Sequence, residues 1–253
     1  MLEIRKLRAG YSGQVVLDGV DMTLDGGSVT AILGPNGCGK STLFKALCGI
    51  LRPLSGEVVL DGEQVLALPQ QLRAQRIAYL AQSRQIPDIT VERLVLHGRF
   101  PYLSYPRRYR TEDIAAAREA MQRMDITDLA DAPLNRLSGG QRQKAYIAMA
   151  LAQATPVILL DEPTTYLDVS HQLQLLREAR ALAEQGKTVA MVLHDLPHAM
   201  GVADRIVLMA GGRVAAQGTP EEVYASGLMD GVFGVRLRRM WAEGAWRYYC
   251  EEG

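Results

Sequence analysis

The sequence predicts an α/β fold in which a parallel β-sheet and its helices are interrupted by a helical insertion. Three observations support this prediction. Short, continuous apolar runs at residues 157–160, 188–193 and 205–209 are typical of strands buried in a parallel sheet. A segment with the apolar spacing of a crossover helix lies between the first two runs. From residue 83 to residue 136 the sequence pattern changes, and apolar residues recur mainly at the spacing of α-helices.

The chain up to residue 82 is expected to be rich in strands and to contain one deeply buried helix. The helix is expected to begin at Lys40, directly after a glycine-rich loop, and to carry Leu43, Leu47 and Ile50 on its inner face. Strand-like runs occupy residues 2–7, 15–17, 28–33, 56–61 and 77–81.

Two later helices have recognisable ends. Thr111 is predicted to be the N-cap of a helix in the insertion, because Glu112 and Asp113 supply an acidic first turn. The crossover helix is expected to end near Gly186. Its inner face is expected to be formed by Leu173, Leu176, Ala179 and Leu182.

The C-terminal part carries two local signals. Residues 219–222 read T-P-E-E, a capping box with Pro220 at the first helical position, so a short helix is expected to start there. Residues 235–240 and 246–250 are expected to pair as a small terminal hairpin.

The composition argues against several classes of protein. Lys plus Arg equals Asp plus Glu at 28 each, and a chain with no basic excess is a poor candidate for a general nucleic-acid binder. No stretch approaches the roughly 20 apolar residues that cross a bilayer, and the N-terminus lacks the apolar region of a secretory signal. Three cysteines without paired spacing indicate reduced thiols in the cytosol. A role at a membrane would therefore require docking onto another chain.

A phosphate-binding loop is the first chemical motif. Residues 34–42 read G-P-N-G-C-G-K-S-T and match every fixed position of G-x-x-x-x-G-K-[ST]. Lys40 is expected to reach the β- and γ-phosphates, and the Ser41 hydroxyl to bind Mg²⁺. The helix that follows directs its positive end at the phosphates. The expected nucleotide-binding residues are Gly34, Pro35, Asn36, Gly37, Cys38, Gly39, Lys40, Ser41 and Thr42.

Two carboxylates follow the apolar run at 157–160. Asp161 stands at the carboxyl end of a buried strand beside a phosphate loop, a position from which it can hold Mg²⁺ through water. Glu162 comes next and is expected to act as the general base that polarises the attacking water, an effect typically worth about 10²–10⁴ in rate.

A second anion-binding helix end is predicted at residues 137–141, which read L-S-G-G-Q. Ser138, Gly139 and Gly140 precede a long apolar-faced segment, so their N–H groups open the helix in the same way as the first loop. The motifs above already supply a phosphate loop, a metal ligand and a general base for one nucleotide, so this second helix end is not needed for that site within a single chain.

This set of motifs, in this order, resembles the ATP-binding subunit of an ABC (ATP-binding cassette) transporter over nearly the whole chain. The resemblance implies a P-loop NTPase (RecA-like) core with an N-terminal antiparallel β subdomain and an inserted α-helical subdomain. The implied boundaries are 1–82 and 137–218 for the core with its β subdomain, 83–136 for the helical insertion, and 219–253 for a C-terminal helix and short β extension. In this family L-S-G-G-Q contacts the γ-phosphate bound by the other subunit, so that two chains hold ATP head to tail.

The resemblance also implies roles for single residues. Tyr11 matches the aromatic residue that stacks on adenine, and His194 matches the histidine that bonds the γ-phosphate. Gln82 matches the glutamine that senses Mg²⁺ and the attacking water, which gives Ser41, Gln82 and Asp161 as the Mg²⁺ residues. The residues acting in trans are Ser138, Gly139, Gly140, Gln141 and Asp168, the last of which signals across the dimer. The other histidines, His97, His171 and His198, have no ligand-like spacing, so no metal site held by the protein alone is predicted.

Three stretches resemble importers of ferric siderophores, haem and cobalamin in particular. They are L-H-G-R-F-P-Y at 96–102, D-E-P-T-T-Y-L-D with S-H-Q at 161–172, and V-L-H-D-L at 192–196. His97, Lys144, Tyr146 and the pair Pro197–His198 depart from the usual pattern. A siderophore is the expected cargo, with haem and cobalamin left open.

The resemblance implies a place and partners for the chain. It would lie at the cytoplasmic face of the membrane, held by permease subunits that a periplasmic or extracellular binding protein serves, and no nucleic acid is expected. Residues 100–110 hold four aromatic residues and three arginines, and could receive a cytoplasmic helix of the permease. Loop packing with the arginines in water is the alternative.

Two other functions are weighed against import. A non-transport ABC ATPase of DNA repair or translation usually carries two cassettes, long coiled-coil inserts or strong basic patches, and the sequence has none of these. A P-loop kinase would leave L-S-G-G-Q unused.

Overall fold

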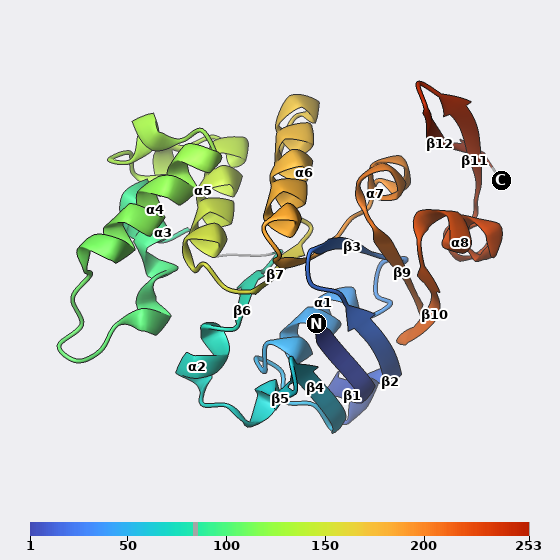
Figure 1. Ribbon diagram of the computed structural model, residues 1–253, viewed down its shortest axis with the longest axis horizontal. Coiled ribbons are helices and arrows are strands. Elements are labelled where there is room, and N and C mark those ends of the chain that lie inside the picture. The colour runs from blue at the N-terminus through green and yellow to red at the C-terminus, as the bar shows by residue number, and fades with distance from the viewer. Residues whose placement is uncertain (83–85, 253) are drawn as a thin grey trace.

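The computed structural model describes residues 1–82 and 86–252. Its main sheet has six strands, of which five run parallel and the edge strand β10 runs antiparallel (Figure 1). Every residue of β3, β7 and β8 is buried, which confirms that the continuous apolar runs form a parallel sheet. The strand order is β10 (Arg213–Gly218), β9 (Arg205–Ala210), β3 (Ser28–Leu33), β8 (Thr188–Val192), β7 (Val157–Asp161) and β6 (Ile77–Leu80).

The main sheet separates two hydrophobic cores. On one face, Ala31 and Leu33 pack with helices α5 (Gly139–Ala152), α6 (Val169–Glu184) and α7 (Leu196–Val202). On the other face, Ile32 packs with helix α1 (Lys40–Leu47) and with a second sheet. Because neighbouring residues of a strand point to opposite faces, β3 contributes to both cores, as do β7, β8 and β9. Strand β3 leads directly into the phosphate loop.

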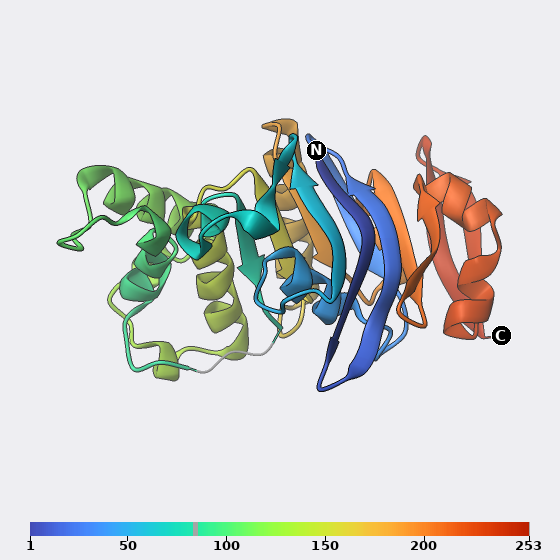
Figure 2. The same ribbon diagram turned by 90° about the horizontal axis from the view of Figure 1, so that it is seen from below.

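The second sheet is antiparallel, with the order β2-β1-β4-β5, and packs against α1 (Figure 2). The antiparallel β subdomain is therefore confirmed. Helix α1 begins at Lys40 as predicted, but the inclusion of Ile50 was wrong: the helix ends at Leu47, Gly49 has a φ of 63°, and Ile50 is 65% exposed. The strands are β1 (Leu2–Tyr11), β2 (Gln14–Leu24), β4 (Ser55–Leu60) and β5 (Glu63–Gln64).

Between β5 and β7 the chain is mainly helical. The short helices η1 (Val65–Ala67) and α2 (Gln70–Ala74) precede β6 and were not predicted. The insertion was predicted to start at residue 83, and residues 83–85 lie outside the described residues. From residue 86 onward its helices are α3 (Val91–His97), η2 (Phe100–Tyr102), α4 (Thr111–Arg123), η3 (Thr127–Leu129) and η4 (Leu134–Arg136).

The predicted N-cap of α4 was wrong by one residue. The cap is Arg110, and Thr111 is the first helical residue. The carboxylate of Asp113, in the first turn of the helix, accepts a hydrogen bond from the backbone N–H of Arg110 at 2.9 Å. This backbone donor at the start of the helix therefore has a partner. The same carboxylate accepts from buried Arg99 at 2.9 Å, which ties α4 to the end of α3.

Helix α6 is rotated relative to the prediction. Leu176, Ala179 and Leu182 are buried as expected, whereas Leu173 is 42% exposed and Leu175 takes the inner position. The expectation for Leu173 was therefore wrong. The helix stops at Glu184, and Gly186 follows with a φ of 86°, as the sequence indicated.

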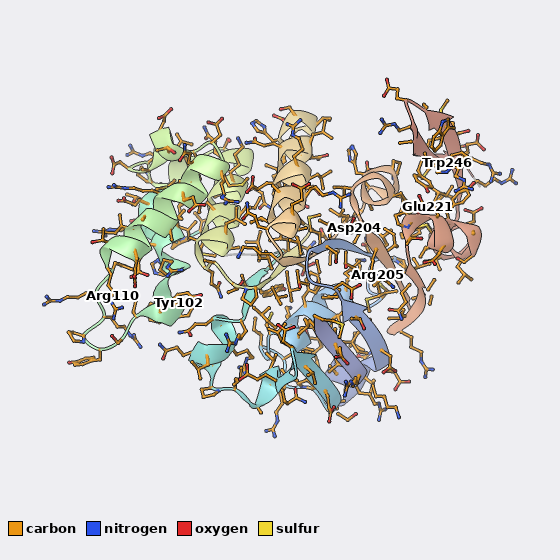
Figure 3. All side chains as sticks on the ribbon, in the orientation of Figure 1. Tyr102, Arg110, Asp204, Arg205, Glu221 and Trp246 are labelled. Atoms are coloured by element: carbon orange, nitrogen blue, oxygen red, sulfur yellow. The ribbon has the colours of Figure 1, made fainter. Side chains whose placement is uncertain are left out.

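The C-terminal segment forms two short helices and a hairpin. Thr219 and Glu222 make the predicted capping box, with distances of 3.2 and 2.8 Å between side-chain oxygen and backbone nitrogen. Figure 3 places Trp246 of the hairpin and Tyr102 of η2 at opposite ends of the molecule. The elements are α8 (Pro220–Ala225), α9 (Leu228–Phe233), β11 (Val235–Ala242) and β12 (Ala245–Glu252).

Within the described residues, none of the helices combines the length and apolar character that crossing a bilayer requires.

Candidate functional site

The loop between β3 and α1 depends on glycine at particular positions. Gly34, Gly37 and Gly39 have φ values of 153°, 79° and 106°. A Cβ on Gly34 would stand 2.3 Å from the carbonyl oxygen of Met209, and a Cβ on Gly39 would stand 2.8 Å from the side chain of Leu17. Any other residue would therefore displace the backbone of β9 or the side chain packed under the loop. The loop conformation is fixed by its surroundings as well as by its own sequence.

Lys40 is buried beneath this loop. Its Nζ donates to the carbonyl oxygens of Gly34 at 2.6 Å and Pro35 at 3.0 Å, and lies 4.0 Å from the sulfur of Cys38. The ammonium group thus stands inside the curve of the loop and has neutral partners there. Its contact with β- and γ-phosphates stays a prediction.

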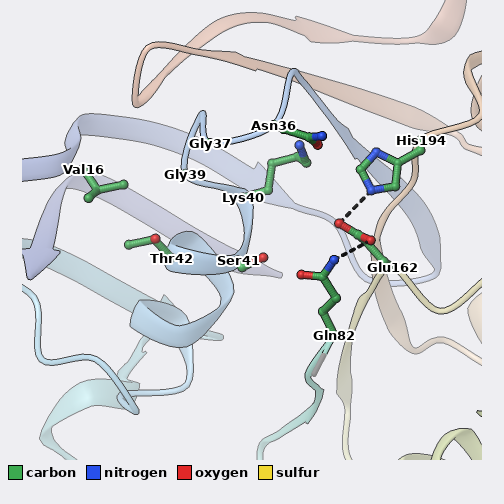
Figure 4. A pocket seen from close by; sticks show the side chains of 10 residues that line it. All are labelled: Val16, Asn36, Gly37, Gly39, Lys40, Ser41, Thr42, Gln82, Glu162 and His194. Atoms are coloured by element: carbon green, nitrogen blue, oxygen red, sulfur yellow. Dashed lines mark hydrogen bonds and ion pairs between the residues drawn. The ribbon is translucent and has the colours of Figure 1, made fainter. Parts of the chain in front are cut away.

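The loop faces a cleft of about 510 Å³, a volume typical of small-molecule sites. Gln82, Glu162 and His194 form the wall opposite Lys40 and Ser41 (Figure 4). Val16 also lines the cleft and was missed, because it lies in a predicted strand far from the loop in sequence. The full lining consists of Val16, Asn36, Gly37, Gly39, Lys40, Ser41, Thr42, Gln82, Glu162 and His194.

The three residues expected to be catalytic meet at one carboxylate. Gln82 donates from Nε2 to Oε2 of Glu162 at 2.7 Å, and Nε2 of His194 lies 2.6 Å from Oε1 of Glu162 (Figure 4). Both carboxylate oxygens therefore have a nitrogen partner. Glu162 adopts a φ of 51°, which is uncommon for a residue other than glycine, and this turn directs its side chain into the cleft.

Asp161 differs from its neighbour because it is completely buried. Its Oδ2 accepts from the hydroxyl of Tyr79 at 3.2 Å, whereas Oδ1 has no hydrogen-bond partner among the described residues. Burial raises the pKa of Asp161 above its ordinary value, and the nearby hydroxyl groups of Ser41 and Tyr79 oppose that shift. A buried carboxylate oxygen without a partner, close to a serine hydroxyl, fits a hard cation such as Mg²⁺.

Tyr11 lies outside this group. It ends β1 opposite Gln14, is 45% exposed, and does not line the cleft. Its role beside adenine stays a prediction.

The L-S-G-G-Q residues begin α5 with a complete capping box. The Ser138 hydroxyl accepts the N–H of Gln141 at 3.2 Å, and the Gln141 side chain accepts the N–H of Ser138 at 3.0 Å. Gly139 stands close to Tyr166, since a Cβ on Gly139 would lie 3.5 Å from the Cβ of Tyr166. Tyr166 is 76% exposed and has a φ of 69°. It belongs to the importer-like stretch at 161–172, but its place beside Gly139 was not predicted.

The helix end at Ser138 and the phosphate loop open into different cavities. Gly139 lines a cavity of about 340 Å³ together with Arg142 and Tyr166, and none of residues 138–141 lines the cleft of the phosphate loop. Gln82 lines both cavities. Within one chain, the second anion-binding helix end therefore does not complete the first.

Asp168 is the N-cap of α6. It accepts the backbone N–H of His171 at 3.0 Å and the hydroxyl of Ser170 at 2.9 Å, and it lies 2.9 Å from Nδ1 of His171. These hydrogen bonds, first the one from the His171 backbone, lower the pKa of Asp168 to about 2. Asp168, two residues after Tyr166 on the surface of the protein, is therefore ionised at neutral pH.

Comparisons with known proteins show which proteins the chain is similar to. The family model described as ABC transporter matches residues 17–165. The ferric enterobactin transport ATP-binding protein FepC of Escherichia coli is 45% identical over 91% of this chain and 86% of its own length. The hemin import ATP-binding protein HmuV of Streptomyces coelicolor is 43% identical over 90% of this chain and 81% of its own length.

Solved structures give the same result. A structure titled as the ATP binding subunit of an ABC transporter superimposes with a TM-score of 0.79 and 25% identity, over 91% of this chain and 95% of that one. A bacterial ABC transporter cassette solved as a dimer has a TM-score of 0.76 and 27% identity, over 87% of this chain and 99% of its own.

Proposed function

This chain belongs to the ABC transporter family and is an ATP-hydrolysing subunit of that family, and we propose that it energises uptake of a ferric siderophore through a partner permease. The observation that supports the catalytic part most strongly is the meeting of Gln82 and His194 on Glu162, opposite the phosphate loop. The cargo class rests on the relatives, whose names include ferric enterobactin transport and hemin import. Haem and cobalamin are the other possible cargoes.

The residues of the cleft suggest how hydrolysis proceeds. The oxygen of water attacks the γ-phosphorus, its proton passes to the carboxylate of Glu162, and the bond to the oxygen bridging the β- and γ-phosphorus atoms breaks. His194 is placed to bond the γ-phosphate, and Gln82 to orient the water. Each oxygen of Glu162 has one nitrogen partner and can accept a further hydrogen bond, so the water can bind Glu162 while Gln82 and His194 stay in place.

Asp161, Ser41 and Gln82 are the residues that would hold Mg²⁺. The unpartnered Oδ1 of Asp161 and the Ser41 hydroxyl are oxygen donors of the kind that this ion prefers. When bound, the ion would neutralise negative charge on the phosphates.

We further propose that the nucleotide site is completed by a second copy of the chain. Ser138–Gln141 and Asp168 would act in trans, because the helix end at Ser138 and the phosphate loop open into separate cavities of a single chain. One similar cassette has been solved as a dimer. ATP would close this dimer and hydrolysis would reopen it.

The permease would dock on the helical side of the molecule, at the cytoplasmic face of the membrane. A groove of about 350 Å³ lies between α2 on one side and η2 with the segment after it on the other, and its lining includes Phe100, Pro101, Leu103 and Arg107. The guanidinium of Arg107 covers the ring of Phe100 at 4.5 Å, and Tyr105 is 97% exposed. An apolar helix of the permease suits such a groove. A binding protein outside the membrane would deliver the cargo.

We propose that the helical insertion, predicted at 83–136 and described from residue 86 onward, is a subdomain that moves relative to the core at 1–82 and 137–218. Gln82 stands at their junction and contacts Glu162, so movement of the subdomain would be felt at the attacking water. Residues 219–252 form an extension at the opposite end.

Reconstitution tests the proposed function. The chain would be coexpressed with a siderophore permease with which it copurifies, placed in proteoliposomes with the matching binding protein, and assayed for ATP-dependent uptake of radiolabelled iron as ferric siderophore. Uptake that the Glu162→Gln variant abolishes supports the proposal. Uptake of haem or cobalamin alone would change the cargo, and stable copurification with ribosomes or a nuclease in place of a permease would overturn import.

A further inference from the structure

The carboxylate of Asp161 is held asymmetrically. Its Oδ2 accepts a hydrogen bond from Tyr79 at 3.2 Å, and its Oδ1 has no partner among the described residues, although the whole side chain is buried. An unpartnered buried oxygen costs free energy, so such atoms are rare unless a ligand or function requires them. The two oxygens of this one group therefore have different roles.

Tyr79 is placed for this contact by the register of the sheet. In the parallel pair of β6 and β7, Tyr79 is opposite Leu159, two residues before Asp161. Because residues two apart in a strand share a face, Tyr79 and Asp161 project from the same side of the sheet. That side is the one covered by α1, whose first two residues are Lys40 and Ser41.

The ring of Tyr79 is itself braced. It packs edge-on against Phe44 of α1, with ring centroids 6.3 Å apart and an interplanar angle of 84°. Phe44 is completely buried, so it cannot move aside without disturbing the core between the two sheets. A hydrogen bond from a ring held in this way fixes the rotation of the carboxylate that accepts it.

We propose that Tyr79 is a positioning residue that holds Asp161 by Oδ2 and keeps Oδ1 turned toward the magnesium–nucleotide complex. This inference rests on the proposed function, since it takes Asp161 as part of the Mg²⁺ site. Tyr79 lies in β6, and Gln82 follows the end of this strand by two residues, so one short segment supplies both the residue that orients Asp161 and the residue that contacts Glu162. An ordinary core tyrosine would fill the same space without affecting the metal.

Removing one hydroxyl tests the proposal. Mn²⁺, which is visible by electron paramagnetic resonance, would be titrated into the full chain with ADP, and nucleotide affinity would be measured separately in EDTA. Tyr79→Phe should weaken Mn²⁺ binding about tenfold, the size typical for loss of a group that orients a metal ligand. Nucleotide affinity without metal and the far-ultraviolet circular dichroism should stay unchanged, and the Mg²⁺ concentration that half-saturates hydrolysis should rise in parallel.

Tyr102→Phe is the matched control. The hydroxyl of Tyr102 also donates to a partly buried acceptor, the carbonyl oxygen of Gln153, at 2.8 Å, but Tyr102 does not line the nucleotide cleft. This variant loses one hydrogen bond and should bind Mn²⁺ like the wild-type protein. Equal Mn²⁺ affinity in wild-type protein and Tyr79→Phe, within twofold, would overturn the proposal. Should Tyr79→Phe not fold, Phe44→Leu loosens the brace and should give a smaller shift in the same direction, while unchanged Mn²⁺ affinity would again overturn it.

Asp161→Asn separates this inference from the proposed function. If Asp161→Asn binds Mn²⁺ with ADP as the wild-type protein does, the metal site itself is misassigned. If Asp161→Asn loses Mn²⁺ and Tyr79→Phe does not, the metal site holds and only the positioning role of Tyr79 is wrong.

Discussion

The chain contains two glycine-rich helix starts, at α1 and at α5, and they differ in what surrounds them. The start of α1 has no side-chain cap, lies on a loop of left-handed glycines, and faces Glu162, His194 and Gln82 across a cleft. The start of α5 has its own capping box. Its cavity is lined by Gln82 but by neither Glu162 nor His194. The start of α1 faces the candidate catalytic residues, and among the described residues no other helix start lines its cleft. The start of α5 can bind an anion but lacks the candidate base Glu162. The difference is what we expect if, as proposed, each helix start serves a nucleotide shared with another copy of the chain.

The strongest test of the α1 side is the loss of its base. Glu162→Gln keeps the hydrogen-bonding shape of the side chain but cannot accept a proton, so hydrolysis should fall by about 10²–10⁴-fold. ATP should still bind, and the variant should accumulate as a dimer. Size-exclusion chromatography with and without ATP checks this, and a variant that stays monomeric in ATP would speak against the shared site.

The α5 side is tested by blocking the helix end. Ser138→Arg removes the cap and places a long side chain over the N–H groups of Gly139 and Gly140, so hydrolysis should be lost. Binding of a fluorescent ATP analogue to the isolated subunit should stay within about twofold, because residues 138–141 do not line the cleft of the phosphate loop. Ser55→Arg, at an exposed position of β4, is the control and should hydrolyse ATP normally. Unchanged turnover in Ser138→Arg would show that this helix end is not used.

The two sets of glycines should also differ in their effect on folding. Gly34→Ala places a Cβ 2.3 Å from the Met209 carbonyl oxygen at a positive φ, and should destabilise the isolated chain by about 1–3 kcal/mol. Gly139→Ala meets only an ordinary contact at 3.5 Å and should be neutral, or stabilising by up to about 1 kcal/mol, because alanine favours a helix. Urea unfolding of both variants checks the difference, and equal losses would contradict it.

A smaller effect is expected at Asp168, in the surface segment that follows Tyr166. Its pKa in the folded protein is about 2, below its ordinary value near 3.8, so the stabilisation it provides is present above the ordinary value and is lost as the pH falls toward 2. Asp168→Ala should lower the melting temperature at pH 7 by about 2 °C, and the gap to wild type should narrow below about pH 4. Calorimetry across this range checks the prediction, and a gap that stays constant would contradict it.

Much of this arrangement could be predicted because it is encoded locally. The phosphate loop, the capping boxes at Ser138 and Thr219 and the buried strands each carry their signal within a few residues. The exposed side of Leu173 could not be read in this way, because spacings of three residues fit either of two neighbouring faces of a helix and only tertiary packing selects one. Edge strand β10 was missed since its half-exposed pattern lacks a continuous apolar run.

The contacts within the candidate site could not be predicted from local sequence patterns either. Asp161 and Glu162 could be identified from their place after a buried strand, yet the partners that define their roles lie about eighty residues away along the chain. Tyr79 and Gln82 reach them through the pairing of β6 with β7, which no local pattern specifies. Val16 reaches the cleft from a different sheet.

Cross-linking tests the shared nucleotide site most directly. One chain would carry Asn36→Cys in the phosphate loop and a second would carry Ser138→Cys at the start of α5, both with Glu162→Gln and with Cys38, Cys48 and Cys250 replaced by alanine. The account predicts that a short bifunctional thiol reagent joins the two chains when ATP is present and not in its absence. Failure to cross-link in ATP, together with full hydrolysis by a wild-type monomer, would contradict it.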